Sequence, residues 1–135
     1  MNKTAIIDDN MVFRKVTQIL LKNIGIRDEN ILLFENGKEM FDFMESNSNS
    51  INVLPQMIFL DLNMPVMDGW DFLTQLQGYK KKTSYNPKIY ILTSSVDQKD
   101  YQNVINITTV EKYLIKPINE ETITKIYKEY YPEIL

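Results

Sequence analysis

The sequence predicts an α/β protein in which helices cover both faces of a five-stranded parallel sheet. Five short apolar runs alternate with longer segments in which apolar residues recur every three or four positions. Because the runs are continuously apolar, they are typical of strands buried on both faces, as in parallel sheets. Right-handed crossovers between such strands produce a doubly wound sheet, here built from five βα units.

The five apolar runs are the expected strands. They are rich in β-branched and aromatic residues, which favour strands, and a polar residue directly follows each run. In chain order the runs cover residues 4–7, 31–34, 57–60, 89–92 and 113–115.

The segments that follow the strands show the period of helices. In the first, Val12, Val16, Ile19 and Leu20 recur at helical spacing, and Gly25 is a typical stop signal. The expected helices cover residues 12–24 and 37–45, a stretch that begins near 69, a short stretch around 101–105 and a last one around 123–130. Loops are expected at 46–50 and at 80–87, where a lysine triplet is typical of a solvated helix end.

The composition of the chain excludes several kinds of chemistry. The absence of cysteine excludes a disulfide scaffold and a thiol nucleophile, and the absence of histidine excludes a Ser-His-Asp triad and a phosphohistidine carrier. A net charge of -3 gives no support for nucleic-acid binding, which favours a basic face. No apolar stretch approaches the roughly 20 residues that cross a bilayer, and no signal peptide opens the chain, so we expect a cytoplasmic protein with no membrane partner.

Residues with reactive side chains follow four of the five expected strands. Asp8 and Asp9 follow the first strand, Asp61 the third, Thr93 the fourth and Lys116 the fifth. Each alone has an ordinary explanation as a helix cap or a turn residue. Ligands of doubly wound sheets bind beyond the carboxyl ends of the strands, so we expect these five side chains to converge.

The expected convergence of three carboxylates predicts a cation site. Carboxylates that lie close together repel one another and stay ionised only when a cation offsets their charge. Oxygen ligands without imidazole or thiolate favour a hard ion, and Mg²⁺ fits. Lys116 adds a positive charge, and the Thr93 hydroxyl can bind an anion, so the set suits phosphoryl transfer to a carboxylate nucleophile.

Enzymes of other classes are the contrasting interpretations. A flavodoxin would need a Gly- and Ser/Thr-rich phosphate loop after the first strand, where the acidic residues of 8–10 would repel the FMN phosphate. A P-loop NTPase would need the G-x-x-x-x-G-K-[ST] pattern, which the sequence lacks. A haloacid-dehalogenase-like phosphatase would carry its nucleophile as D-x-D after the first strand, but here the two acids are adjacent.

Four motifs together resemble those of the response-regulator receiver domain, the family of the chemotaxis protein CheY. They read IDDN at 7–10, LDLNMPVMDG at 60–69, LTS at 92–94 and YLIKP at 113–117, and the similarity extends from Lys3 to about Tyr131. The resemblance implies the flavodoxin-like, CheY-like fold with strand order 2-1-3-4-5. It also implies that residues 1–135 form one receiver domain, and we expect no output domain.

The resemblance implies where the phosphoryl group and the metal bind. Asp61 is the phosphoacceptor. Mg²⁺ is held by the carboxylates of Asp8, Asp9 and Asp61 and by the backbone carbonyl of Asn63.

Roles for five further residues also follow from the resemblance. Thr93 hydrogen-bonds the phosphoryl group, and Lys116 pairs with it. Tyr113 matches an aromatic switch position and fills the space that Thr93 leaves when it moves inward, although the residue alone is typical of a half-buried strand aromatic. Pro117 matches a cis proline of the family, and Ser94 stands where Ala or Gly is usual, which concerns the lifetime of the phosphoryl group.

The function that the resemblance implies is that of a two-component response regulator. A histidine kinase or histidine phosphotransfer protein donates the phosphoryl group to Asp61 in a Mg²⁺-dependent reaction. The chain catalyses this transfer and the later hydrolysis but is otherwise no enzyme. Phosphorylation changes the surface of the fourth helix, fifth strand and fifth helix, through which the chain meets a protein effector or a second copy of itself.

Two related interpretations remain open beside the stand-alone switch. The chain could be a phosphorelay intermediate that passes the group from Asp61 to a histidine phosphotransfer protein. It could also be a receiver excised from a larger hybrid kinase.

Overall fold

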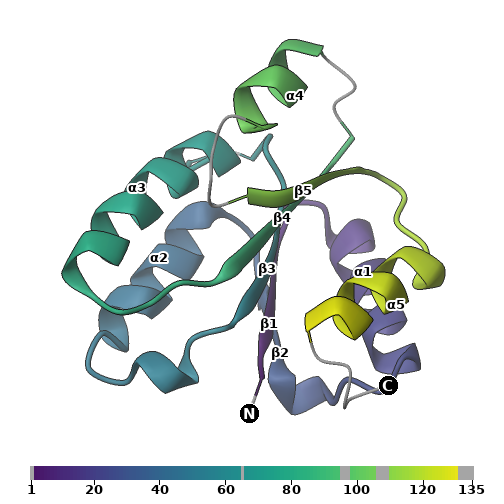
Figure 1. Cartoon of the computed structure of the whole chain (residues 1–135), viewed down its shortest axis with the longest axis horizontal. Coiled ribbons are helices and arrows are strands. Elements are labelled where there is room, and N and C mark those ends of the chain that lie inside the picture. The colour runs from purple at the N-terminus through teal and green to yellow at the C-terminus, as the bar shows by residue number, and fades with distance from the viewer. Residues whose placement is uncertain (1, 65, 95–97, 106–109, 131–135) are drawn as a thin grey trace.

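A five-stranded parallel sheet runs through the protein (Figure 1). The computed structural model describes residues 2–64, 66–94, 98–105 and 110–130. Their strands lie in the order β2-β1-β3-β4-β5, and all four neighbouring pairs are parallel, which confirms the predicted fold class and strand order. The strands are β1 (Thr4–Ile7), β2 (Ile31–Phe34), β3 (Met57–Leu60), β4 (Lys88–Thr93) and β5 (Val110–Ile115).

Helices cover the sheet on both faces. In Figure 1, α1 and α5 lie on one face, α2 and α3 lie on the other, and α4 lies beside β5. The helices are α1 (Met11–Asn23), α2 (Gly37–Ser46), α3 (Gly69–Lys82), α4 (Gln98–Ile105) and α5 (Glu120–Tyr130), with short 3-10 turns at η1 (Asp28–Asn30) and η2 (Ile51–Val53). None of the helices in the described part of the chain has the length and apolarity that crossing a bilayer requires.

Element boundaries differ from the sequence prediction by up to three residues, and two of these differences have a clear physical reason. The lysine triplet 80–82 belongs to α3 instead of the following loop, because cations are favoured in the last turn of a helix. Strand β5 begins at Val110, three residues before the apolar run. Its first residues include the exposed Glu111 and Lys112, and charged side chains are common on edge strands because they oppose pairing with other chains.

The core consists of two apolar clusters, one on each face of the sheet. One cluster joins the odd-numbered positions of β1 and β4 to Met40, Met44, Phe72 and Leu76 of α2 and α3. The other joins their even-numbered positions to side chains of α1 and α5. Each fully buried side chain of this kind stabilises the fold by about 1.5–3 kcal/mol relative to exposure, so burial on both faces holds the strand ends in fixed positions.

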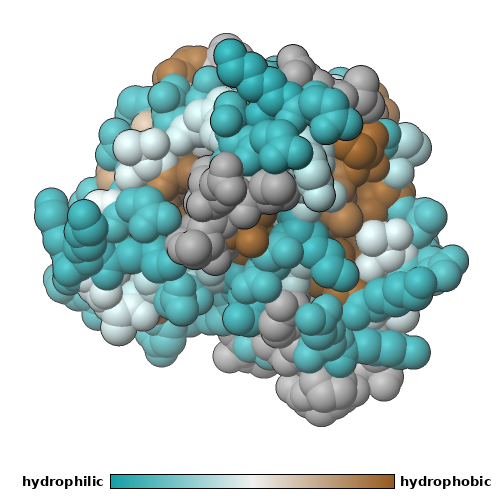
Figure 2. All heavy atoms as spheres, turned by 45° about the horizontal axis from the view of Figure 1, so that its top comes forward, coloured by the Kyte–Doolittle hydropathy of each residue, from teal (hydrophilic) through white to brown (hydrophobic). Residues whose placement is uncertain are grey.

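Helix α1 turns a different face to the sheet than its apolar spacing indicated. Val12 and Ile19 are 65% and 55% exposed, whereas Thr17 and Leu21 are buried. The helix carries apolar residues on two faces, and the buried face includes the polar Thr17, so spacing alone could not identify it. Figure 2 shows a largely hydrophilic surface with apolar residues at its right, the side on which Figure 1 places α1 and α5.

Candidate functional site

Backbone hydrogen bonds fix the residues that follow the strands. The Asp8 N–H donates to the last residue of β2 at 3.1 Å, and the Asp61 N–H donates to the last residue of β1 at 2.9 Å. The Lys116 N–H donates to the last residue of β4 at 2.8 Å. The hydrogen-bond ladder therefore continues one residue past these strands, and the three side chains start from fixed points at one edge of the sheet.

Three carboxylates meet at this edge. Oxygen atoms of Asp8, Asp9 and Asp61 all lie within 4.8 Å of one another. Asp8 and Asp61 are buried, whereas Asp9 is exposed. Oxygen-only ligands with one open side fit a hard divalent cation that keeps several water molecules, so the donor set fits Mg²⁺.

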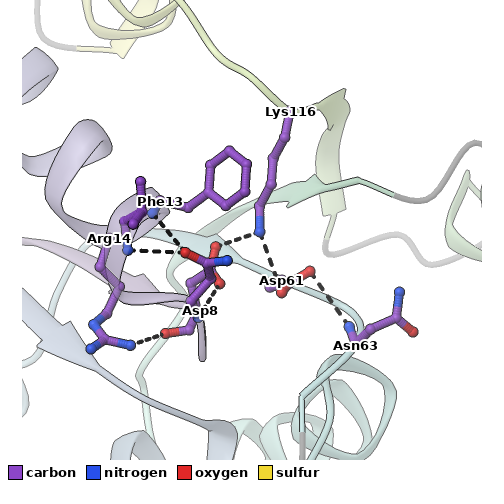
Figure 3. Close-up of polar contacts among 8 residues, drawn as sticks. Asp8, Phe13, Arg14, Asp61, Asn63 and Lys116 are labelled. Atoms are coloured by element: carbon purple, nitrogen blue, oxygen red, sulfur yellow. Dashed lines mark hydrogen bonds and ion pairs between the residues drawn. The ribbon is translucent and has the colours of Figure 1, made fainter.

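Asn63 borders the cluster. Its backbone N–H lies 3.5 Å from Asp61 Oδ1, and its side chain points away from Asp61 (Figure 3). A role for Asn63 as a metal ligand therefore depends on its backbone carbonyl and stays a prediction.

Lys116 reaches across the edge to two of the three acids. Its Nζ lies 2.6 Å from Asp8 Oδ2 and 3.4 Å from Asp61 Oδ2 (Figure 3). The side chains of all three residues are 5–6% exposed. Close pairing of this kind is required here because an unpaired buried charge costs several kcal/mol.

The surroundings of Asp61 change its acidity. Burial, followed by the negative charge of Asp8, raises the pKa of Asp61 above its ordinary value. The Lys116 ammonium, the Asn63 N–H and the Thr93 hydroxyl oppose this rise because they stabilise the ionised form. Asp61 is thus a buried carboxylate of raised basicity surrounded by hydrogen-bond donors.

Thr93 and Tyr113 lie on the neighbouring strands β4 and β5, and Thr93 contacts this carboxylate. Thr93 ends β4, is fully buried and hydrogen-bonds Asp61 through its hydroxyl group. Tyr113 pairs in register with Ile91 and is half-buried. Its ring packs edge-on against Tyr101 of α4, with a centroid distance of 5.4 Å.

The remaining predicted positions lie around this group. Ser94 is exposed, and the Lys116–Pro117 peptide bond is cis, as the resemblance implied. Pro65 of the second motif and Ser95 lie outside the described residues.

The first turn of α1 contributes three residues that the sequence analysis did not assign to the site. The Asn10 N–H donates to Asp8 Oδ1 at 2.9 Å, and Asn10 Oδ1 caps the helix. Arg14 Nη1 donates to the backbone oxygen of Asp8 at 2.6 Å, and the centroid of the Phe13 ring lies 4.3 Å from Lys116 Nζ. The available sequence signal was Asn10 as a helix N-cap. Phe13 and Arg14, three and four residues later, lie on the same side of the helix as the capping residue.

The fold and the site define a class: a doubly wound α/β protein with an oxygen-lined acidic centre at the carboxyl ends of its strands. The sequence model of the response regulator receiver domain matches residues 4–128. The chain therefore belongs to the response regulator receiver domain family.

Similar proteins include both short regulators and long kinases. The chain is 27% identical over 130 residues to the peroxide stress-activated histidine kinase mak3 of Schizosaccharomyces pombe, covering 96% of this chain but 5% of that protein. It is 25% identical over 127 residues to the probable methanogenesis regulatory protein FilR2 of Methanothrix harundinacea, covering 92% of this chain and 77% of that protein.

A solved structure shows the same fold. A two-component response regulator from Cytophaga hutchinsonii superposes with a TM-score of 0.82 at 18% identity, covering 96% of each chain.

Proposed function

We propose that this receiver accepts a phosphoryl group on Asp61 from a phosphohistidine of a histidine kinase or histidine phosphotransfer protein. The observation that carries the proposal is the buried Asp61 carboxylate, which lies beside two further acids and a buried ammonium. Phosphoryl transfer to a carboxylate needs a nucleophile, ligands for a divalent cation and a positive charge, and all three are present at this site.

The transfer needs no group of the chain other than those at the site. An Asp61 oxygen attacks phosphorus, the phosphorus–nitrogen bond of the donor breaks, and the electron pair of that bond returns to the imidazole. Lys116, 3.4 Å from Asp61 Oδ2, is placed to pair with a phosphoryl oxygen. The Thr93 hydroxyl already hydrogen-bonds Asp61 and is placed to donate to a second phosphoryl oxygen.

Asp8, Asp9, Asp61 and the carbonyl of Asn63 would hold Mg²⁺, which offsets the negative charge that gathers on the transferring group. The later reversal is a hydrolysis. Water attacks phosphorus, the phosphorus–oxygen bond to Asp61 breaks, and inorganic phosphate leaves. Exposed Ser94 stands next to Thr93 and is placed to affect how readily water enters.

We infer a signalling output through protein contacts. Tyr113 and Tyr101 connect β5 to α4, so a movement at Thr93 can reach the surface of α4, β5 and α5, where an effector or a second copy would bind. In this proposal residues 1–135 act in the cytoplasm as one domain, and their catalysis is limited to their own phosphorylation and dephosphorylation.

A phosphorelay role is the second candidate. It is supported by curated relatives that are histidine kinases, such as the osmosensing histidine protein kinase SLN1 of Saccharomyces cerevisiae, of which the chain covers 10% at 30% identity. Transfer of radiolabel from phosphorylated Asp61 to a purified histidine phosphotransfer protein would favour this role over a terminal switch.

Phosphorylation by acetyl phosphate with Mg²⁺ tests the proposed function. We expect one acyl phosphate per wild-type chain, none on Asp61→Asn or Asp61→Ala, and none when a chelator removes Mg²⁺. Asp42→Asn is the matched control, because Asp42 lies exposed on α2 and forms an ion pair with Lys38 at the surface. Phosphate found on a serine, threonine or tyrosine, or turnover of phosphate esters, would contradict the proposal.

A further inference from the structure

An aromatic ring lies against the buried ammonium of Lys116. The centroid of the Phe13 ring is 4.3 Å from Lys116 Nζ, and Figure 3 shows the ring beside the end of the lysine side chain. This distance is well within the roughly 6 Å over which a cation is attracted to an aromatic face. Phe13 is half-buried and belongs to neither apolar cluster of the described residues, so core packing does not account for it.

One helical turn fixes both the ring and one of the acids. Asn10 Oδ1 accepts hydrogen bonds from the backbone N–H groups of Val12 and Phe13, at 2.9 and 3.2 Å. The Asn10 N–H holds the Asp8 carboxylate, and Arg14 holds the Asp8 carbonyl. The first turn of α1 thereby sets the distance between the Asp8 carboxylate and the Phe13 ring, and Lys116 Nζ contacts both.

We propose that Phe13 is a positioning residue for phosphoryl acceptance, which holds the Lys116 ammonium in place through a cation–π contact. The proposal rests on the proposed function of Asp61. It assigns to Phe13 no contact with the phosphoryl group, because the ring acts through the lysine.

The physical reason is that the anionic partners of Lys116 have other tasks. Asp8 and Asp61, 2.6 and 3.4 Å from Nζ, are also the acids that would bind a divalent cation and the phosphoryl group. When their oxygens turn to those partners, the ammonium loses contacts that offset its desolvation. The Phe13 ring is no ligand for a divalent metal ion or a phosphoryl oxygen, so it remains a constant contact for Lys116 throughout the reaction.

Substitutions at residue 13 test this role by the rate of phosphorylation with acetyl phosphate and Mg²⁺. We expect Phe13→Leu to slow acceptance about tenfold, the size of effect that loss of one partly desolvated cation–π contact produces. Phe13→Tyr keeps an aromatic face and should restore the rate to within about twofold of wild type. Phe41→Leu is the matched control, because Phe41 is half-buried on α2 and packs against Tyr79 away from the acids.

Fluorinated phenylalanines at residue 13 separate electrostatics from shape. Successive ring fluorines weaken the negative face of the ring while they keep its size, so the logarithm of the rate should fall stepwise with their number. If Phe13→Leu slows the reaction but the fluorinated series is flat, the ring acts by shape and the proposal is wrong. A Phe13→Leu rate equal to wild type would overturn it as well.

Nuclear magnetic resonance of the lysine side chains reads the contact without any reaction. We expect the Lys116 Hε protons to be shifted upfield by the ring, and Phe13→Leu to remove this shift. If the Lys116 Hε protons are unshifted in a wild-type chain that does accept phosphate, the role of Phe13 is wrong and the proposed function of Asp61 stands. Failure of wild type to accept phosphate, with Lys116 still shifted, would instead overturn the role in phosphorylation and leave the contact as structural.

Discussion

The two edges of the sheet bury different kinds of polar group. At the carboxyl edge the buried groups include three ions, those of Asp8, Asp61 and Lys116, beside the Thr93 hydroxyl. At the amino edge they are neutral hydroxyl groups. Tyr85 donates to the carbonyl of Pro55 and Tyr79 to that of Met44, while Thr4 and Tyr127 hydrogen-bond each other.

The difference separates stability from function. A buried hydroxyl–carbonyl pair is satisfied without charge, so the amino edge contributes stability at all ordinary pH values. Buried ions cost desolvation and are retained where chemistry needs them. Substitutions at the amino edge should therefore lower the free energy of unfolding without affecting phosphorylation. Removal of an acid at the carboxyl edge should instead abolish or slow phosphorylation without lowering the free energy of unfolding.

The largest effect is expected where the carboxyl edge depends on backbone packing. A Cβ added at Gly69 would lie 2.5 Å from the Asp61 carbonyl oxygen and 2.8 Å from the Leu62 Cα, both of them backbone atoms. Gly69→Ala should therefore lower the free energy of unfolding by about 3 kcal/mol and also slow phosphorylation, because the Asp61 backbone must shift. Urea unfolding and acetyl phosphate kinetics measure the two effects.

Gly78→Ala is the matched control for that substitution. Apart from the chain neighbours and the adjacent backbone of α3 itself, no atom lies within 4 Å of a Cβ built at Gly78, which is an exposed position within the same helix. Alanine there should raise the free energy of unfolding by about 0.5–1 kcal/mol through helix propensity and leave phosphorylation unchanged. Equal stability effects at the two glycines would refute the close approach of α3 to Asp61.

A smaller effect is expected at the amino edge. Tyr85→Phe removes the donor to the Pro55 carbonyl and leaves a buried acceptor unsatisfied, so the free energy of unfolding should fall by about 2 kcal/mol. The phosphorylation rate should stay that of wild type. Tyr101→Phe, at a 42% exposed tyrosine, should change stability by less than about 0.5 kcal/mol. A slowed phosphorylation in Tyr85→Phe would mean that the two edges are coupled.

The sequence predicted the fold because each strand carries its own signal. The buried strands β1 and β3 are uninterrupted apolar runs, and their predicted bounds match the structure. The edge strand β5 was predicted too short, since only its last three residues form a continuous apolar run. The orientation of α1 was missed because Thr17, a polar residue, occupies its buried face.

The reactive side chains of the site could be predicted from the sequence, but their arrangement and the supporting residues of α1 could not. The rule that strand ends converge placed Asp8, Asp9 and Asp61 together, and the structure does bring them together. Contacts of Lys116 with Phe13 and Asp8 depend on side-chain reach across the sheet edge, which no spacing in the sequence encodes. Contacts of this kind, between residues far apart in the chain, become visible only in the three-dimensional structure.

Apart from the control substitutions, the smallest effect expected is a gain in stability, and it concerns Asp61 itself. Burial and the charge of Asp8 hold the pKa of Asp61 above its ordinary 3.8. Between these two values the folded chain keeps a proton that the unfolded chain has released, so stability falls as pH rises through that window. Asp61→Asn does not titrate, and Lys116 keeps its contact with Asp8 in this variant.

In a chelating buffer Asp61→Asn should therefore be more stable than wild type at pH 7, with the difference in stability shrinking towards pH 4. Urea unfolding midpoints of wild type and Asp61→Asn across this pH range measure the difference, with Asp42→Asn as a control at an exposed position. Mg²⁺ should reduce the difference in stability between Asp61→Asn and wild type, because it binds the folded wild-type chain. A wild type more stable than Asp61→Asn at pH 7 without Mg²⁺ would show that the ion pairs at the carboxyl edge outweigh their desolvation, which would remove the contrast between the two edges.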